Sequence, residues 1–162
     1  MENKLVNAIS DLSLRMRLIK SLQEEKSSSS NLSDRDFLLL EMVSKAGRMT
    51  ISQIAALHSN VSESTISTTI TRLWRDKKVV SKTRCPENQR VTYVELTEKG
   101  KKELEIFAEH QAVRYKALLK AMQISEDEGK MLIEIISRAN NVFDSHLEKD
   151  KAASEIIKKS GV

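Results

Sequence analysis

The chain has 162 residues, of which 40% are apolar and 31% charged, so it can bury a core beneath a well-solvated surface. Its formal net charge of +4 permits a nucleic-acid partner without requiring one. Aromatic residues make up only 4%, which argues against a platform for single-stranded nucleic acid, because such platforms stack bases on aromatic rings.

Cys85 is the single cysteine, which excludes an intrachain disulfide and favours a cytoplasmic location. No apolar run approaches the roughly 20 residues of a membrane span, and the first residues lack the basic and then apolar pattern of a signal peptide. We therefore expect a cytoplasmic protein without a membrane partner. Four glycines and one proline predict long helices and few tight turns.

Apolar side chains at spacings of three and four predict an amphipathic helix over residues 3–25, followed by a short polar linker. We assign residues 1–31 to a dimerisation helix and its linker. The stretch 33–36 caps a second helix, whose apolar residues leave little polar face and predict burial. Gly47 ends this helix.

A helix-turn-helix is predicted over residues 50–78 or so. Thr50 and Gln53 fit a capping box that opens a short helix. A four-residue turn then leads to a helix over 60–78, for which Ser62 is a good N-cap because its hydroxyl can accept from a free backbone amide. Two short helices joined by a tight turn are typical of this DNA-binding motif.

The helix over 60–78 has two unlike faces. Ile66, Ile70 and Leu73 share an apolar face at helical spacing, and Trp74 is expected to pack near its edge. Hydroxyl and guanidinium groups, which suit phosphate oxygens and base edges, occupy the other face and its flanks. These residues are Ser64, Thr65, Thr68, Thr71, Arg72 and Arg75.

A basic hairpin is predicted directly after this helix. Residues 79–84 favour a strand, Pro86 and Asn88 favour a turn, and 90–96 alternate between apolar and polar side chains. A hairpin in this place is a wing, here about 79–96. Residues 72–90 hold seven positive charges against two negative ones, an excess of +5 that exceeds the +4 of the whole chain and favours nucleic acid. The positive residues are Arg72, Arg75, Lys77, Lys78, Lys82, Arg84 and Arg90.

Two further helices follow the wing. Thr97 caps a helix that runs to about Met122, roughly 39 Å and longer than a small domain can cover. Ser125 and Glu128 form a second capping box, and the helix that follows carries an apolar stripe as far as Leu147. We expect residues 99–148 to form the dimer interface together with the N-terminal helix. Residues 149–162 read as a charged tail.

This order of elements resembles the MarR (multiple antibiotic resistance regulator) family of winged helix-turn-helix transcription factors. The similarity covers about residues 3–148, and its specific motifs are STIS at 64–67, Arg72-Leu73, NQR at 88–90 and LTEKG at 96–100. The resemblance implies a mainly helical homodimer with a small β-hairpin wing, whose recognition helices enter successive major grooves and whose wings reach flanking minor grooves. The DNA-contacting residues expected from the helix face and wing are Ser62, Ser64, Thr65, Thr68, Thr71, Arg72, Arg75, Lys82, Arg84 and Arg90.

Three positions depart from the family pattern. Asn88 replaces an aspartate that commonly helps to hold the wing arginine, which predicts a looser Arg90. Lys77 and Lys78 stand where a glycine usually separates the helix from the wing. Thr68 replaces a common arginine in the middle of the helix, so the operator sequence cannot be borrowed from relatives.

The predicted function is a transcriptional regulator of double-stranded DNA, a repressor acting as a homodimer on a pseudo-palindromic operator of about 10 base pairs between half-site centres. The alternative is a winged-helix dimer that serves as a protein-interaction module without DNA. An enzyme is not expected, because the sequence has no nucleophile triad in one site, no glycine-rich phosphate loop and no paired carboxylates.

No cofactor or metal is predicted. The three histidines, His58, His110 and His146, lack metal-ligand spacing, so zinc is disfavoured. Relatives often hold a small effector, frequently an aromatic acid, but the low aromatic content gives this no support. Cys85 lies in the wing, where an ordinary role is favoured over redox sensing, since sensing needs an activated thiol and a resolving partner.

Overall fold

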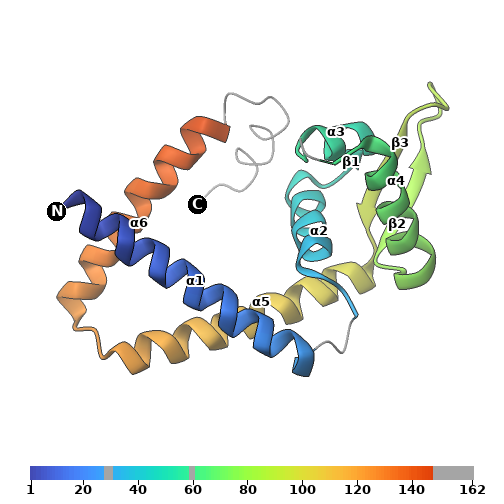
Figure 1. Cartoon of the computed structure of the whole chain (residues 1–162). Coiled ribbons are helices and arrows are strands. Elements are labelled where there is room, and N and C mark those ends of the chain that lie inside the picture. The colour runs from blue at the N-terminus through green and yellow to red at the C-terminus, as the bar shows by residue number, and fades with distance from the viewer. Residues whose placement is uncertain (28–30, 59–60, 148–162) are drawn as a thin grey trace. The chain divides into compact units, whose positions relative to one another are not determined.

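The computed structural model describes residues 1–27, 31–58 and 61–147, and within 20–27 it describes the backbone alone. The middle of the predicted linker and the predicted charged tail at 149–162 lie outside these residues. The chain divides into two units, Met1–Ser33 and Asp34–Val162, which are described separately. Figure 1 shows the elements of both.

The first unit is one long helix, α1 (Glu2–Ser27). The amphipathic pattern predicted this helix, and the observed ends extend the predicted range by one or two residues. Its apolar side chains Leu5, Ile9 and Leu12 are all more than half exposed in the single chain. The helix therefore has an apolar face that its own unit does not cover.

The core of the second unit lies between three helices and a small sheet. The helices are α2 (Asp34–Ala46), α3 (Ile51–Ala56) and α4 (Glu63–Arg72), and the strands are β1 (Met49–Thr50), β2 (Val80–Arg84) and β3 (Thr92–Leu96). The side chains of Leu40, Ile54, Ile70, Leu73 and Val94 are fully buried there. The apolar face predicted for the recognition helix is thus its core face.

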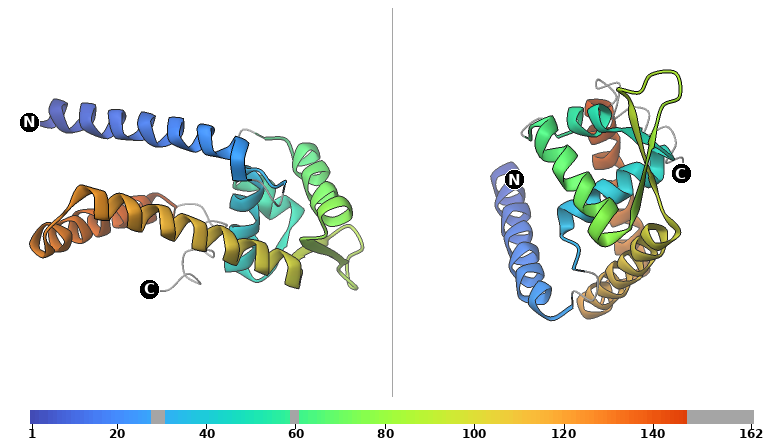
Figure 2. Two further views of the ribbon diagram at one scale, coloured as in Figure 1. Left: turned by 90° about the horizontal axis from the view of Figure 1, so that it is seen from below. Right: turned by 90° about the vertical axis from the view of Figure 1, so that its right-hand side faces the viewer.

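The sheet has three antiparallel strands in the order β1-β3-β2. Lys82 of β2 and Met49 of β1 both face Val94 of β3 across the ladder. The sequence predicted only the β2–β3 hairpin, because the two residues of β1 are too few to show an alternating pattern. The loop between β2 and β3 projects beyond α4, as a wing does (Figure 2).

Helix α2 is less buried than its sequence predicts. Leu39 and Leu40 are buried, whereas Leu38 between Phe37 and Leu39 is 50% exposed. The ring of Phe37 stacks on that of Phe107 at 4.0 Å between centroids, which joins α2 to α5 (Glu98–Met122). Gly47 ends α2 with a φ of 80°, a left-handed conformation that glycine adopts without strain.

The start of α5 needs a glycine. Thr97 is the N-cap as predicted, and its Oγ1 accepts from the backbone amide of Gly100 at 3.1 Å. A Cβ on Gly100 would lie 2.0 Å from the carbonyl oxygen of Val79, so the residue that precedes β2 and the first turn of α5 approach too closely for a side chain. This contact gives a physical reason for the LTEKG motif.

Helix α6 (Glu126–Leu147) follows α5 after a short turn. The predicted capping box is present, since the Ser125 backbone amide and hydroxyl both donate to Glu128 Oε2 at 2.8 Å. These two bonds, that of the amide first, lower the pKa of the Glu128 carboxyl. No residue of α6 is buried within the single chain, although its stripe includes Ile136 and Phe143. Among the described residues, no helix is both long and apolar enough to cross a membrane.

Candidate nucleic-acid interface

The helix-turn-helix is built from two capped helices. Thr50 Oγ1 accepts from the Gln53 amide at 3.1 Å, and Gln53 Oε1 accepts from the Thr50 amide at 2.8 Å, which confirms the predicted capping box. Ser62 is the N-cap of α4 and accepts from the Thr65 amide at 3.2 Å, also as predicted. Ser52 Oγ donates to Glu63 Oε1 at 3.0 Å, so a direct contact links α3 to the start of α4.

The recognition segment is not one uniform α-helix. The α-helix α4 stops at Arg72, and Leu73–Lys77 form a π-helical turn, η1. Lys78 then takes a φ of 59°, and its amide donates to the carbonyl of Leu73. Lys78 therefore adopts the left-handed conformation that suits the glycine missing here, and a lysine pays a steric cost to do so.

The threonine hydroxyls of α4 are already used as donors. Thr68 Oγ1 donates to the Ser64 carbonyl at 3.0 Å, and Thr71 Oγ1 donates to the Ser67 carbonyl at 2.8 Å. Thr68 is exposed, whereas Thr71 is half-buried and its Oγ1 also accepts from Lys82 Nζ at 3.2 Å. In these rotamers the two hydroxyl oxygens can still accept from base amino groups but cannot donate to phosphate oxygens, which refines the expectation that threonine suits both base edges and phosphates.

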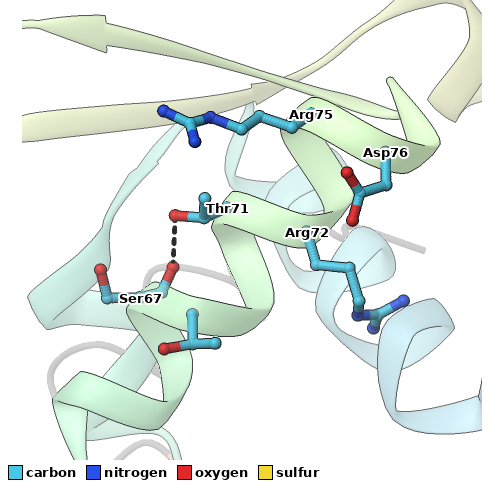
Figure 3. A pocket seen from close by; sticks show the side chains of 6 residues that line it. Ser67, Thr71, Arg72, Arg75 and Asp76 are labelled. Atoms are coloured by element: carbon cyan, nitrogen blue, oxygen red, sulfur yellow. Dashed lines mark hydrogen bonds between the residues drawn. The ribbon is translucent and has the colours of Figure 1, made fainter.

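An open groove of about 400 Å³ runs along this side of the helix. It is lined by Ser67, Thr68, Thr71, Arg72, Arg75 and Asp76. Figure 3 shows Arg72 and Arg75 pointing to opposite sides of the helix. Five of the residues predicted for DNA contact from α4 and η1, namely Ser62, Ser64, Thr65, Thr68 and Arg75, are exposed, and Thr71 and Arg72 are half-buried.

Arg72 has a partner that the sequence did not reveal. Its Nη2 donates to Oδ1 of Asp36 at 2.5 Å, and the Asp36 side chain is only 3% exposed. From the sequence, Asp36 is expected to be part of a helix cap. A single sequence does not indicate an ion pair with a residue 36 positions away. Arg72 therefore has a structural role in this ion pair, in addition to the DNA contact predicted from its position on the helix.

Trp74 differs from its expected placement. Its side chain is 39% exposed rather than packed at the edge of the core. Trp74 is the second residue of the π-helical turn η1, in which the rotation per residue is smaller than the roughly 100° of an α-helix. Trp74 therefore joins the exposed surface beside the recognition helix.

The wing carries the remaining predicted contacts. Lys82 is half-buried, and Arg84 and Arg90 are exposed. Asn88 Oδ1 accepts from the backbone amide of Arg90 at 3.1 Å, and the Asn88 carbonyl accepts from the Val91 amide at 2.9 Å. Asn88 thus closes the turn through the backbone, as an aspartate at this position also can.

Metal ligation and redox sensing each need particular side chains in this region. In the parts of the chain that the structure describes, no three His, Cys, Asp or Glu side chains gather closely enough to hold a metal ion. Cys85 is a half-buried free thiol whose backbone amide donates to the Val91 carbonyl at 2.9 Å. This bond between backbone groups joins the two ends of the wing loop, and the thiol takes no part in it.

Comparisons with known proteins agree on one class. The sequence pattern of the family described as "Transcriptional regulator SarA/Rot" matches residues 17–106. A search of curated protein sequences found no significant match.

Solved structures of regulators share the fold. Streptococcus pneumoniae FabT in complex with DNA has a TM-score of 0.70 at 16% identity, covering 90% of this chain and 99% of FabT. A MarR family protein from Bacillus stearothermophilus has a TM-score of 0.71 at 17% identity, covering 88% and 97%. MarR itself has a TM-score of 0.64 at 20% identity, covering 83% and 95%. The predicted resemblance to MarR regulators is confirmed at the level of the fold.

Proposed function

The chain belongs to the SarA/Rot family of transcriptional regulators, and we propose that it regulates transcription by binding double-stranded DNA as a homodimer. The observation that carries this proposal is the surface formed by α4, η1 and the wing, which holds an excess of positive charge on a helix-turn-helix of the right geometry. The solved structure of FabT with DNA, which has the same fold, supports it.

Recognition is divided between base edges and phosphates. The oxygen and methyl group of the exposed Thr68 are suited to base edges in the major groove, and Thr71 Oγ1 keeps one lone pair for the same use beside its bond from Lys82. Arg75, Lys82, Arg84 and Arg90 supply cations for phosphates and, at the wing, for a narrow minor groove. Ser62, Ser64 and Thr65 lie at the start of α4, where backbone amides and the helix dipole favour an anion.

The apolar faces of the long helices support the homodimer. Leu5 and Ile9 of α1, and Ile136 and Phe143 of α6, are each at least half exposed in the single chain. Apolar side chains repeated at helical spacing on two helices normally bury against a partner. Residues 1–31 and 99–148 would supply this interface, and residues 32–98 the DNA-binding domain, with half-sites about one helical turn apart.

The regulator acts as a cytoplasmic repressor in this proposal, without enzymatic activity or a bound cofactor. Repression follows if the dimer covers a pseudo-palindromic operator that overlaps a promoter. The test is to select bound fragments from the genome that encodes the chain and to measure transcription from the selected promoters with and without the protein. A pseudo-palindromic consensus and reduced transcription are expected, whereas increased transcription would make the protein an activator.

A further inference from the structure

Two cations from different elements lie close to one exposed aromatic ring. The guanidinium carbon of Arg75 and the ammonium nitrogen of Lys82 each lie 5.3 Å from the centroid of the Trp74 ring. Arg75 and Trp74 belong to η1, and Lys82 belongs to β2. Cation–π attraction thus holds the end of the recognition segment and the base of the wing to a common ring.

The position of Lys82 is further fixed by a hydrogen-bond chain. Its Nζ donates to Thr71 Oγ1 at 3.2 Å, and that hydroxyl donates to the Ser67 carbonyl at 2.8 Å. Because the Trp74 ring and the Thr71 hydroxyl both restrict the Lys82 side chain, that side chain loses less conformational entropy when it binds a ligand. The ammonium group is therefore preorganised beside the recognition helix.

In the part of the chain that the structure describes, no carboxylate oxygen lies within 4.0 Å of a side-chain nitrogen of Arg75 or Lys82. The ion pairs found there within 4.0 Å involve Arg15, Arg72, Lys101 and Lys130 as cations. Asp76, which shares η1 with Arg75, does not come within that distance of either cation. Two like charges that share one ring repel each other, and an anion close to both cations would relieve the repulsion.

The location of this cluster identifies the anion. If α4 enters the major groove and the wing reaches the adjacent minor groove, one sugar-phosphate strand must pass between them. We infer that Trp74, Arg75 and Lys82 form a seat for that strand, in which the two cations contact phosphates and the indole N–H supplies a further donor. This inference rests on the proposed function and adds Trp74 to its DNA-contacting residues.

The chain has a single tryptophan, so its fluorescence reports on this seat alone. The probe is a mixed-sequence duplex of about 30 base pairs with a terminal dye, at about 50 mM salt, where sequence-independent binding is strong. Dye anisotropy follows binding, and tryptophan emission with the neutral quencher acrylamide follows Trp74. We expect the duplex to change the emission and to lower the acrylamide quenching constant several-fold.

Variants separate the seat from general electrostatics. Trp74→Ala should weaken duplex binding about three- to thirtyfold, and Trp74→Phe less, because the ring remains while the N–H is lost. Arg75→Ala and Lys82→Ala should each reduce the log–log salt slope by about 0.9 for each copy that makes the contact. Lys130→Ala, which removes an exposed cation paired with Glu126 in α6, should leave the slope unchanged. Circular dichroism establishes that each variant is folded.

Two results would overturn the inference, and they are distinguishable. If anisotropy shows saturable binding while emission and quenching stay constant, the strand does not contact Trp74, and the proposed function stands without this seat. If no duplex raises the anisotropy even at low salt, the proposed function fails and the seat fails with it.

Discussion

The Nη2 of Arg72 lies 2.5 Å from the Oδ1 of Asp36, so the last residue of the recognition helix is joined to the first turn of α2 by an ion pair. The carboxylate is buried, whereas the Arg72 side chain is 39% exposed. The pair fixes the angle at which α4 leaves the core, because α2 is itself anchored by Leu39, Leu40 and Val43. Arg72 thus contributes to the position of the DNA-reading face.

Replacement of Arg72 should therefore destabilise the protein even without DNA. Arg72→Ala removes the guanidinium that pairs with the buried Asp36 carboxylate, and we expect the free energy of unfolding to fall by about 2 kcal/mol. This is less than the roughly 3–5 kcal/mol of a fully buried pair, since water screens the exposed part of Arg72. Urea denaturation measures the loss.

The matched control for this pair is Asp36→Asn, alone and combined with Arg72→Ala. The loss of unfolding free energy in the double variant should be smaller than the sum of the losses in the two single variants, because each single substitution removes the same interaction. A fully stable Arg72→Ala protein that had lost only sequence preference would assign Arg72 to base reading alone.

The wing arginine should act on all sequences alike. Arg90→Ala is expected to weaken binding to operator and non-operator duplexes by similar factors and to reduce the log–log salt slope by about 0.9 for each copy that makes the contact. Anisotropy titrations at several salt concentrations measure both effects. Loss of operator preference with an unchanged salt slope would instead make Arg90 a base reader.

Asn88 offers a test of how the wing turn is held. Its Oδ1 accepts from the Arg90 amide, and an aspartate oxygen can do the same. Asn88→Asp should therefore preserve the turn, whereas Asn88→Ala should loosen it and weaken DNA binding. Backbone amide hydrogen exchange at Arg90 reports the turn directly, and equal protection in both variants would show that the side chain is not needed.

Gly100 should be intolerant of even one added methyl group. Its Cβ would meet the Val79 carbonyl oxygen at 2.0 Å, so Gly100→Ala must displace backbone, and we expect a loss of about 1–3 kcal/mol in unfolding free energy. Gly129 is the matched control, because nothing lies within 4 Å of its Cβ position and it sits inside α6. Gly129→Ala should stabilise the helix by about 0.5–1 kcal/mol. Denaturation midpoints that ranked the two variants in the opposite order would contradict the close approach.

The exposed apolar stripe of α6 should control oligomeric state. Phe143 is 66% exposed in the single chain, and Phe143→Asp should weaken self-association at least about 30-fold if the residue is buried against a second copy. Ser145→Asp adds the same charge at an exposed polar position nearby and should leave the dimer intact. Analytical ultracentrifugation distinguishes the two, and a monomeric wild-type protein would refute the homodimer.

The sequence predicts the elements of this fold well where the signal is local. Caps at Thr50, Ser62, Thr97 and Ser125 and the apolar positions of α4 follow from neighbouring residues, and the structure confirms them. Strand β1 was not predicted, because two residues carry no period and their pairing with β3 is a long-range contact.

The candidate site was predicted less completely than the fold. The basic surface and its hydroxyl-bearing helix are visible in the sequence, but the partners of individual side chains are not. Arg72 is paired with Asp36 through tertiary packing, and Trp74 lies in a π-helical turn where an α-helical one is expected. The threonine hydroxyls are occupied by carbonyls of their own helix, which depends on rotamer rather than on residue type.

The measurement that tests DNA binding most directly is the salt dependence of affinity for a selected operator duplex. If Arg75, Lys82, Arg84 and Arg90 of both copies each neutralise one phosphate, the log–log slope should be about −7, with two chains bound per duplex. A flat dependence on salt, or no binding to any genomic fragment, would contradict the account and favour a winged-helix dimer that recognises another protein.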